Sequence, residues 1–203
     1  MREYIISDEA NCKYCYKCLR NCHVKAISFS ENSSRVIPDE CILCGKCIEI
    51  CPQNAKKSVY DAYKLKQFFG SPFIVSIAPS FFAHFENPFK VIGFFKKKGA
   101  IVSETSIGAE FVSKEYKNLY EDQSIITTSC PVVVDFVEKY YPEFIEYLAP
   151  VVSPAIAHAR FLKKEFGNLP IVFLGPCIAK KKELEEEFDL VLTFSEFEKF
   201  LEN

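Results

Sequence analysis

Eight of the ten cysteines in this chain of 203 residues form two runs with identical spacing. Each run reads Cys-x2-Cys-x2-Cys-x3-Cys. The first contains Cys12, Cys15, Cys18 and Cys22, and the second contains Cys41, Cys44, Cys47 and Cys51. Two-residue spacers let a chain curl so that three thiols face one centre, while the fourth cysteine points away toward a neighbouring centre. The runs therefore predict two adjacent metal centres.

This spacing is typical of bacterial two-cluster ferredoxins, in which the fourth cysteine of each run binds the other cluster. We therefore predict two [4Fe–4S] clusters, the first held by Cys12, Cys15, Cys18 and Cys51, and the second by Cys41, Cys44, Cys47 and Cys22. The segment 26–38 predicts a hairpin with a polar tip, as the ferredoxin fold requires. A segment of about fifty residues has too small a hydrophobic core to fold without cross-links such as these metal clusters.

Zinc and disulfide bonds are the alternatives. Zinc sites use paired Cys-x2-Cys knuckles and need no third cysteine at the same spacing. The N-terminus has no apolar signal-peptide core, and no run approaches the roughly 18 apolar residues of a membrane span. We therefore expect a cytoplasmic protein without a membrane span, whose thiols stay reduced and available for metal. The formal net charge of -2 gives no indication of a nucleic-acid-binding surface.

The composition changes near residue 58, where the cysteine-rich part ends. We predict a ferredoxin-like domain at 1–58, a linker helix at 59–70 and an α/β domain at 71–203. In the last part, short buried runs predict strands at 73–79, 100–105, 124–129, 170–175 and 189–194, with helical patterns between them. The predicted fold class is an α+β two-cluster ferredoxin module followed by an α/β domain with a mostly parallel sheet.

The two remaining cysteines stand at the ends of predicted strands. Cys130 and Cys177 each follow such a strand, as does the tripeptide Ala78-Pro79-Ser80. Ligands of parallel sheets gather at the carboxyl ends of strands. We therefore expect these three strand ends to form one site. Each cysteine, taken alone, is better explained as a small buried hydrophobic residue, and only the surrounding motifs favour a metal ligand.

Four stretches of the second part resemble successive motifs of the [FeFe]-hydrogenase large-subunit domain. They are "SIAPS" (76–80), "TSCPVVVDFVEKYYPE" (128–143), "VVSPAIAHAR" (151–160) and "GPCIAKKKE" (175–183). They follow a two-cluster ferredoxin module in that family's order, and the resemblance runs from about residue 5 to the C-terminus. The residues at the variable positions of these motifs are more similar to the sensory branch of the family than to the hydrogen-evolving branch.

The resemblance implies a second kind of cofactor. In that family an H-cluster joins a [4Fe–4S] cube to a two-iron unit that carries carbonyl and cyanide ligands, and four cysteines hold the cube. By resemblance, Cys130 and Cys177 are two of these four. The two-iron pocket would be lined by Ala78, Pro79, Ser80 and Pro154. This resemblance implies an H-cluster wherever the native chain continues into the remaining ligands.

The resemblance also assigns catalytic positions, and several of them depart from the family. Lys180 would donate to a cyanide ligand, and Glu183 remains from the proton path. Ser129 stands where the family has a proton-passing thiol, and a hydroxyl is a far weaker acid, so fast proton delivery should suffer. Tyr116 replaces a proton-path glutamate, and Gly175 replaces a methionine. The third motif, with the other two cysteines, does not occur before residue 203, so we expect a chain truncated before it.

Two classes of function follow. The first is an N-terminal portion of a sensory hydrogenase-like protein, in which electrons pass through the two clusters toward an H-cluster-type site. The second is a ferredoxin-like carrier or redox-sensing regulatory module without an H-cluster. Both require a redox partner protein, either ferredoxin-like or an oxidoreductase. The first also predicts a downstream signalling domain or partner.

Overall fold

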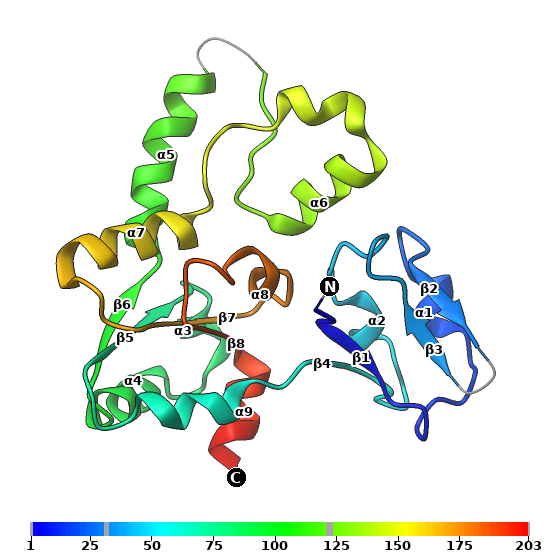
Figure 1. The fold of residues 1–203 in the computed structure, drawn as a ribbon, viewed down its shortest axis with the longest axis horizontal. Coiled ribbons are helices and arrows are strands. Elements are labelled where there is room, and N and C mark those ends of the chain that lie inside the picture. Colours follow the sequence, from blue (N-terminus) through cyan, green and yellow to red (C-terminus); the bar gives the residue numbers. More distant parts are fainter. Residues whose placement is uncertain (1, 31–32, 121–123, 203) are drawn as a thin grey trace. The chain divides into compact units, whose positions relative to one another are not determined.

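The computed structural model describes residues 2–30, 33–120 and 124–202, and its ribbon is drawn in Figure 1. The chain forms two compact units. One comprises the residues up to Tyr60 together with Cys177–Ala179, and the other comprises Asp61–Pro176 and the residues from Lys180 onward. Among the described helices, none combines the length and the apolar character that crossing a bilayer requires.

The first unit is built from two copies of one strand–helix–strand element. The first copy contains β1 (Ile5–Ser7), α1 (Lys17–Arg20) and β2 (Ile27–Phe29), and the second contains β3 (Ser34–Val36), α2 (Lys46–Glu49) and β4 (Lys56–Ser58). Antiparallel pairing joins β1 to β4 and β2 to β3. The β2–β3 pair confirms the predicted hairpin, although residues 31–32 at its tip lie outside the described part. The predicted ferredoxin-like α+β fold of this unit is confirmed.

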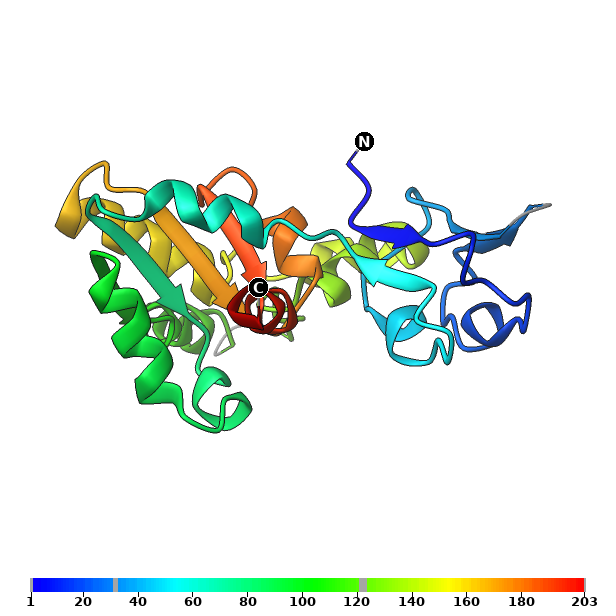
Figure 2. The same ribbon diagram turned by 90° about the horizontal axis from the view of Figure 1, so that it is seen from below.

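The second unit contains a four-stranded sheet in the order β6-β5-β7-β8. Its strands are β5 (Phe73–Ile77), β6 (Ala100–Glu104), β7 (Ile171–Gly175) and β8 (Leu190–Thr193). All three pairings are parallel, which Figure 2 shows as arrows pointing the same way. This confirms the predicted α/β class and four of the five predicted strands to within two residues at each end.

The fifth predicted strand, 124–129, is wrong. In this segment only Ile126 makes a β-bridge, to Leu148, and the segment does not join the sheet. The side chain of Thr128 instead donates to the carbonyl oxygens of Ala149, at 3.2 Å, and Val151. An apolar run of this length predicts a strand from sequence, but here its polar side chains are bonded to the loop that precedes α7.

Helices cover both faces of the sheet. On one face Ser76 of β5 and Ser103 of β6 contact His158 of α7 (Pro154–Phe166), and α5 (Ser106–Tyr120) packs against α7. The other face is an aromatic core. Phe73 of β5 lies against Phe68 and Phe69, and rings extend from there into α4 (Pro88–Lys97) and α9 (Phe194–Glu202). In Figure 1, α5 and α7 lie on the opposite side of the sheet from α4 and α9.

The remaining elements are short. They are η1 (Ala62–Phe68), α3 (Phe81–His84), α6 (Pro131–Tyr140), η2 (Pro142–Tyr147) and α8 (Ala179–Glu183). The segment predicted as a linker helix contains η1, a 3₁₀ helix whose Ala62, Leu65 and Phe68 are buried in the core of the second unit. The division at residues 58 and 70 stays a prediction.

Candidate metal centres

The two cysteine loops have the same backbone course. Left-handed backbone angles occur at Tyr14, Tyr16 and Lys25 in the first half, and at Leu43, Gly45 and Asn54 in the second. Residues other than glycine adopt such backbone angles at a cost of about 1–3 kcal/mol each, and these angles persist only where the surrounding structure enforces them. In both halves two of these bends flank the middle cysteine. The bends turn the loop, so that its three cysteines are presented on one side.

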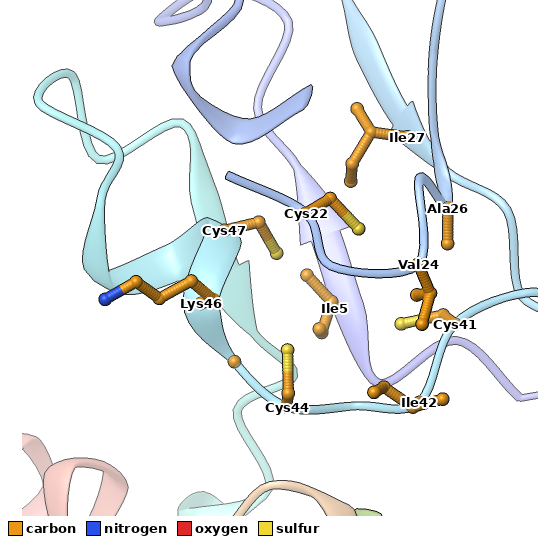
Figure 3. Close-up of a pocket in the computed structure, with 11 residues that line it drawn as sticks. Ile5, Cys22, Val24, Ala26, Ile27, Cys41, Ile42, Cys44, Lys46 and Cys47 are labelled. Atoms are coloured by element: carbon orange, nitrogen blue, oxygen red, sulfur yellow. The ribbon is translucent and has the colours of Figure 1, made fainter. Parts of the chain in front are cut away.

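The cysteines of the second predicted centre line one cavity. Cys41, Cys44 and Cys47 are joined there by Cys22 from the first run (Figure 3). The other lining side chains are mainly apolar and include Ile5, Val24, Ala26, Ile27 and Ile42. Four soft thiol ligands around an apolar cavity suit a [4Fe–4S] cluster. Among the described residues, no three His, Cys, Asp or Glu side chains converge closely enough to hold a single metal ion.

The cysteines of the first predicted centre have polar neighbours. Cys12 Sγ lies 3.9 Å from Ser34 Oγ, and Cys15 Sγ lies 3.6 Å from Gln53 Oε1. The backbone N–H of Ala55 donates to Cys51 Sγ at 3.2 Å. Hydrogen bonds to ligand sulfurs stabilise negative charge on a centre. The assignment of the eight ligands to two centres stays a prediction.

The electrostatic surroundings differ between the two sets of thiols. Burial, reinforced by the neighbouring Cys41, raises the pKa of Cys47 to about 12. At Cys12 burial also acts to raise the pKa, but hydrogen bonds from the backbone of Tyr14 and Ser34 outweigh it, and the net pKa is lowered. Thiolates, rather than thiols, bind metal. Cys47 therefore needs a bound cation to ionise, whereas Cys12 is helped by its own loop.

In the second unit, the predicted site segment that follows β5 lies beside β7, at the point where the strand order reverses. The chain passes from β5 to β6 on one side and later returns to β7 on the other, so β5 and β7 are neighbours whose connections diverge. Such a switch point is where open parallel sheets bind ligands. Ala78 follows β5, and its N–H donates to the carbonyl oxygen of Leu174 in β7 at 2.9 Å. Pro79 and Ser80 are exposed beside it.

Pro154 lies on a different element from the other residues predicted to line the two-iron pocket. It begins α7, and its carbonyl oxygen packs against Gly108 of α5. That it lines one pocket with Ala78, Pro79 and Ser80 stays a prediction.

The three residues predicted at catalytic positions lie together. Lys180 Nζ donates to the backbone carbonyl of Ser129 at 3.2 Å and forms an ion pair with Glu183. The side chains of Lys180 and Glu183 are 14% and 16% exposed, so this pair is screened from bulk water. The arrangement holds a positive charge directly over the residue that precedes Cys130.

The hydroxyl of Ser129 belongs to a small polar cluster. Tyr116 Oη lies 3.3 Å from Ser129 Oγ and 3.1 Å from Thr128 Oγ1. Tyr116 Oη also accepts from the N–H of Thr128 at 2.9 Å. Both tyrosine and serine hydroxyls are weak acids. The cluster therefore orders the segment before Cys130 and offers only weakly acidic groups for moving protons.

The two remaining cysteines occupy different settings. Cys130 is exposed and stands at the N-cap of α6, where its carbonyl oxygen accepts from the N–H groups of Val133 and Val134. Because 124–129 is not a strand, the expectation that Cys130 follows a strand was wrong. Cys177 is half-buried and comes two residues after β7. Cys130 lies in the second unit and Cys177 groups with the first, so a site shared by both stays a prediction.

Comparison with known families places both parts of the chain. Residues 71–203 match the family described as "Iron only hydrogenase large subunit, C-terminal domain", and residues 4–52 match a "4Fe-4S dicluster domain". The chain belongs to the iron-only hydrogenase large-subunit family. Its N-terminal part is a 4Fe-4S dicluster domain, which confirms the resemblance and the iron–sulfur character predicted from the cysteine spacing.

Two known proteins are similar to this chain, one over nearly all of it and one over about a quarter of it. The chain is 23% identical over 261 aligned residues to the NADP-reducing hydrogenase subunit HndD of Solidesulfovibrio fructosivorans; the alignment covers 97% of this chain and 44% of that protein. It is also 38% identical over 47 residues to a subunit of the ion-translocating oxidoreductase complex of Methanosarcina acetivorans; this covers 23% of this chain and 18% of the relative. The chain thus spans less than half the length of either relative.

One departure from the hydrogenase motifs has a structural cause in this chain. A Cβ atom on Gly175 would lie 2.5 Å from Cε1 and 2.7 Å from Cζ of Phe173. The ring of Phe173 therefore fills the space that a side chain at residue 175 would need. A methionine there requires that ring to move.

Sequence reasoning missed one buried cation of the first unit. Lys56 is 2% exposed and donates to Ser7 Oγ and, at 2.7 Å, to the carbonyl oxygen of Ser34. Burial lowers its pKa, while the thiols of Cys18 and Cys47 oppose that shift. Its sequence context, "NAKKSVY", reads as a surface segment. Aligning the two halves of the repeat gives the one available signal, because the position equivalent to Lys56 in the first half holds the apolar residue Ile27.

Proposed function

We propose that this chain is an electron carrier that relays single electrons through two [4Fe–4S] clusters toward a hydrogenase-type site, in a sensory member of its family. The observation that carries the proposal is the cavity lined by Cys22 together with Cys41, Cys44 and Cys47 (Figure 3). A fourth thiol from the other run is what an interlocked pair of cubes requires. A zinc knuckle has no need of it.

Bound [4Fe–4S] clusters supply one-electron transfer, and the chain's own residues set the conditions for it. The thiolates of the two runs hold the iron. The N–H of Leu43 donates to Cys41 Sγ at 3.3 Å and that of Ala55 to Cys51 Sγ at 3.2 Å, so each centre has a backbone donor to a ligand sulfur. The buried Ile5 and Ile27 exclude water from the second centre. These features favour a small structural rearrangement when a cluster gains or loses an electron.

A sensory role is supported by the polar cluster at Ser129. Where the family passes protons through a thiol and a glutamate, this chain has the hydroxyls of Ser129 and Tyr116, 3.3 Å apart. Weakly acidic groups slow proton delivery. Slow exchange of protons suits a protein that reports on hydrogen or redox state more than one that turns over quickly.

The residues at hand do not fit a complete H-cluster. The sequence has ten cysteines, of which eight are assigned to the dicluster domain, leaving Cys130 and Cys177 for a cube that the family holds with four. Hydrogen activation is therefore not part of the activity proposed for these residues. Lys180 and Glu183 would serve there as a fixed charge pair beside Ser129.

A redox partner protein is part of the proposal. The relatives include a subunit of an NADP-reducing hydrogenase and a subunit of an ion-translocating oxidoreductase complex, both named as parts of larger assemblies. We expect the partner to be an oxidoreductase or a ferredoxin-like protein that exchanges single electrons with the first unit.

Metal and sulfide analysis of the anaerobically purified chain tests this function. We expect about eight irons and eight inorganic sulfides per chain, with paramagnetic signals of reduced [4Fe–4S] clusters on addition of dithionite. Zinc in place of iron would overturn the proposal. Infrared bands of carbonyl and cyanide ligands distinguish the two classes of function, because only a chain with an H-cluster shows them.

Two cysteine variants test the division of the ligands. Cys41→Ala should remove one cluster, about four irons, and destabilise the first unit. Cys130→Ala should leave both clusters in place and serves as the matched control. Loss of the same iron in both variants would contradict the assignment.

A further inference from the structure

The two halves of the first unit are related by a shift of 29 residues. β1 begins at Ile5 and β3 at Ser34, α1 at Lys17 and α2 at Lys46, and β2 at Ile27 and β4 at Lys56. The same shift relates the left-handed positions of the two loops. It also carries the predicted ligands of one centre onto those of the other. Each wall position of one centre therefore has a partner at the other.

This relation exposes a difference between the walls of the two centres. The second cavity is lined by Ile5, Val24, Ile27 and Ile42, and the related positions at the first centre hold Ser34, Gln53, Lys56 and Lys13. Ala26 is matched by Ala55, which leaves that position unchanged. Four apolar walls at one centre thus correspond to four polar or charged residues at the other.

Among these residues Lys56 has the strongest effect, because it is buried. Lys13 is exposed, so solvent screens its charge, whereas Lys56 is 2% exposed. The Lys56 ammonium is held in place by its bonds to Ser7 Oγ and Ser34 O. Its strongest electrostatic interaction with a thiol is with Cys18 of the first centre, followed by Cys47 of the second, and then by Cys12 and Cys51, so that three of its four thiol partners are predicted ligands of the first centre.

Backbone donors do not cancel this difference. Backbone N–H groups donate to ligand sulfurs at both centres, from Leu43 to Cys41 at 3.3 Å at the second and from Ala55 to Cys51 at 3.2 Å at the first, where Cys12 also accepts from the backbone of Tyr14 and Ser34. The further side-chain contacts, Ser34 to Cys12 and Gln53 to Cys15, both lie at the first centre. The Ser34 hydroxyl acts in the same direction as the charge of Lys56 when its O–H points at sulfur. Gln53 faces Cys15 with its amide oxygen, which accepts from a thiol and adds nothing to that effect.

We propose that Lys56 makes the two centres unequal, so that the one held by Cys12, Cys15, Cys18 and Cys51 has the higher reduction potential. Reduction adds one negative charge to a centre. A buried positive charge nearby stabilises that added charge, and it does so more strongly where the local dielectric constant is low. The second centre has no matching buried cation among the side chains that line its cavity, because Lys46, which also lines it, is 37% exposed and pairs with Glu49. This inference rests on the two-cluster function proposed above.

The consequence is a fixed order of reduction. One electron from a low-potential one-electron donor reduces the first centre, with no bond formed or broken and no proton required. A second electron is needed before the second centre is reduced. The first electron therefore resides on the first centre. Lys56 acts as a positioning residue, because its charge determines which of the two centres is reduced first.

A redox titration of the anaerobic, cluster-loaded chain, followed by electron paramagnetic resonance, tests the proposal. Iron and sulfide analysis comes first and confirms that both centres are present. We then expect two separate one-electron steps. Cys15→Ser and Cys44→Ser, which are matched by the 29-residue shift, each alter the spectrum of one centre and so identify which step belongs to it. The higher step should carry the change caused by Cys15→Ser.

Lys56→Met then removes the charge. We expect the electron to shift away from the first centre by at least tenfold in the equilibrium between the two, equivalent to about 59 mV for one electron. Lys56→Gln keeps a hydrogen-bond donor without the charge and should give most of the same shift. Lys57→Met is the control, because Lys57 is adjacent but 45% exposed and pairs with Asp8. It should change the equilibrium by much less.

The outcomes separate the inference from the function. A chain that does not assemble two centres overturns the proposed function and this inference with it. Two centres of equal potential, or a higher step assigned by Cys44→Ser, overturn the inference alone. An equilibrium that Lys56→Met leaves unchanged overturns the role of Lys56. If the Met variant fails to fold, Lys56→Gln, which keeps a hydrogen-bond donor, makes the same test, and the order of the two steps in the unaltered chain is tested without either variant.

Discussion

Lys181 and Glu196 form an ion pair inside the second unit, with Nζ 2.8 Å from Oε1 and side chains 2% and 3% exposed. Lys181 also binds Asp61 Oδ2 at 2.9 Å. Glu196 in turn accepts from the N–H groups of Asp61 and Thr193. The network ties α8 to the start of η1 and to α9. It thereby fixes the helix that presents Lys180 to Ser129.

Replacing Lys181 should strongly destabilise the second unit. Lys181→Met removes the lysine paired with the buried Glu196 and one of the two lysines paired with Asp61, and breaking a buried pair in this way costs about 3–5 kcal/mol. Urea unfolding followed by far-ultraviolet circular dichroism measures the loss. Lys114→Met is the control, since Lys114 and Glu110 are exposed at 67% and 72% and such pairs contribute only about 0.3–0.5 kcal/mol. Equal losses in the two variants would contradict the role of the network.

The contact between α5 and α7 predicts opposite effects for two glycines. A Cβ atom on Gly108 would lie 2.0 Å from the carbonyl oxygen of Pro154 and 2.8 Å from the backbone nitrogen of His158. Gly108→Ala should therefore separate the helices and cost about 1–3 kcal/mol or more. Gly93 in α4 has no such neighbour within 4 Å, so Gly93→Ala should stabilise by about 0.5–1 kcal/mol. Thermal unfolding of both variants shows whether the signs differ.

The cysteine spacing and the apolar periodicity predicted most of the architecture. The fold of the first unit follows from the ligand runs, and four parallel strands follow from short buried runs such as 73–77. Gly99 follows the apolar pattern of α4 directly, and it has φ +96 one residue after the C-cap of that helix, a backbone angle that favours glycine. These features are local, so a short window of sequence contains their physical cause.

The features that failed depend on long-range register. Segment 124–129 has the composition of a strand, but Thr128 bonds to Tyr116 and to the loop at Ala149, which no local pattern shows. Lysines are the clearest case. In the run 180–182, Lys180, Lys181 and Lys182 bind Ser129, Glu196 and Asp135 respectively, and the local sequence indicates none of these partners. Whether a lysine such as Lys181 is buried depends on where its carboxylate partner lies in the folded chain, and a local sequence pattern does not contain that position.

His158 predicts a pH dependence of stability. It is fully buried between Ser76 Oγ and Ser103 Oγ, each 2.8 Å from a ring nitrogen, and burial lowers its pKa to about 4. The unfolded chain, with a pKa near 6.5, therefore takes up the proton first as the pH falls. The stability contributed by neutral His158 is complete above pH 6.5 and is lost between pH 6.5 and about 4, on the order of 3 kcal/mol.

Nitrogen-15 chemical shifts of the His158 ring measure this directly. The ring should remain neutral at about pH 5.5 in the folded protein, with one nitrogen donating to a serine and the other accepting. In His158→Gln the slope of stability against pH over this interval should be reduced. A ring that is already protonated at that pH in the folded chain contradicts the prediction.

Tyr116 predicts the order of the segment that precedes Cys130. Tyr116→Phe removes the acceptor of the Thr128 N–H and the partner of Ser129 Oγ. Leaving partly buried groups without a partner costs about 1–3 kcal/mol locally. Hydrogen exchange at the Thr128 amide should therefore become roughly tenfold faster or more, since about 1.4 kcal/mol corresponds to a factor of ten. Tyr120→Phe, one turn further along α5 and 73% exposed, should leave that rate unchanged. If both variants exchange alike, the hydroxyl of Tyr116 does not hold this segment.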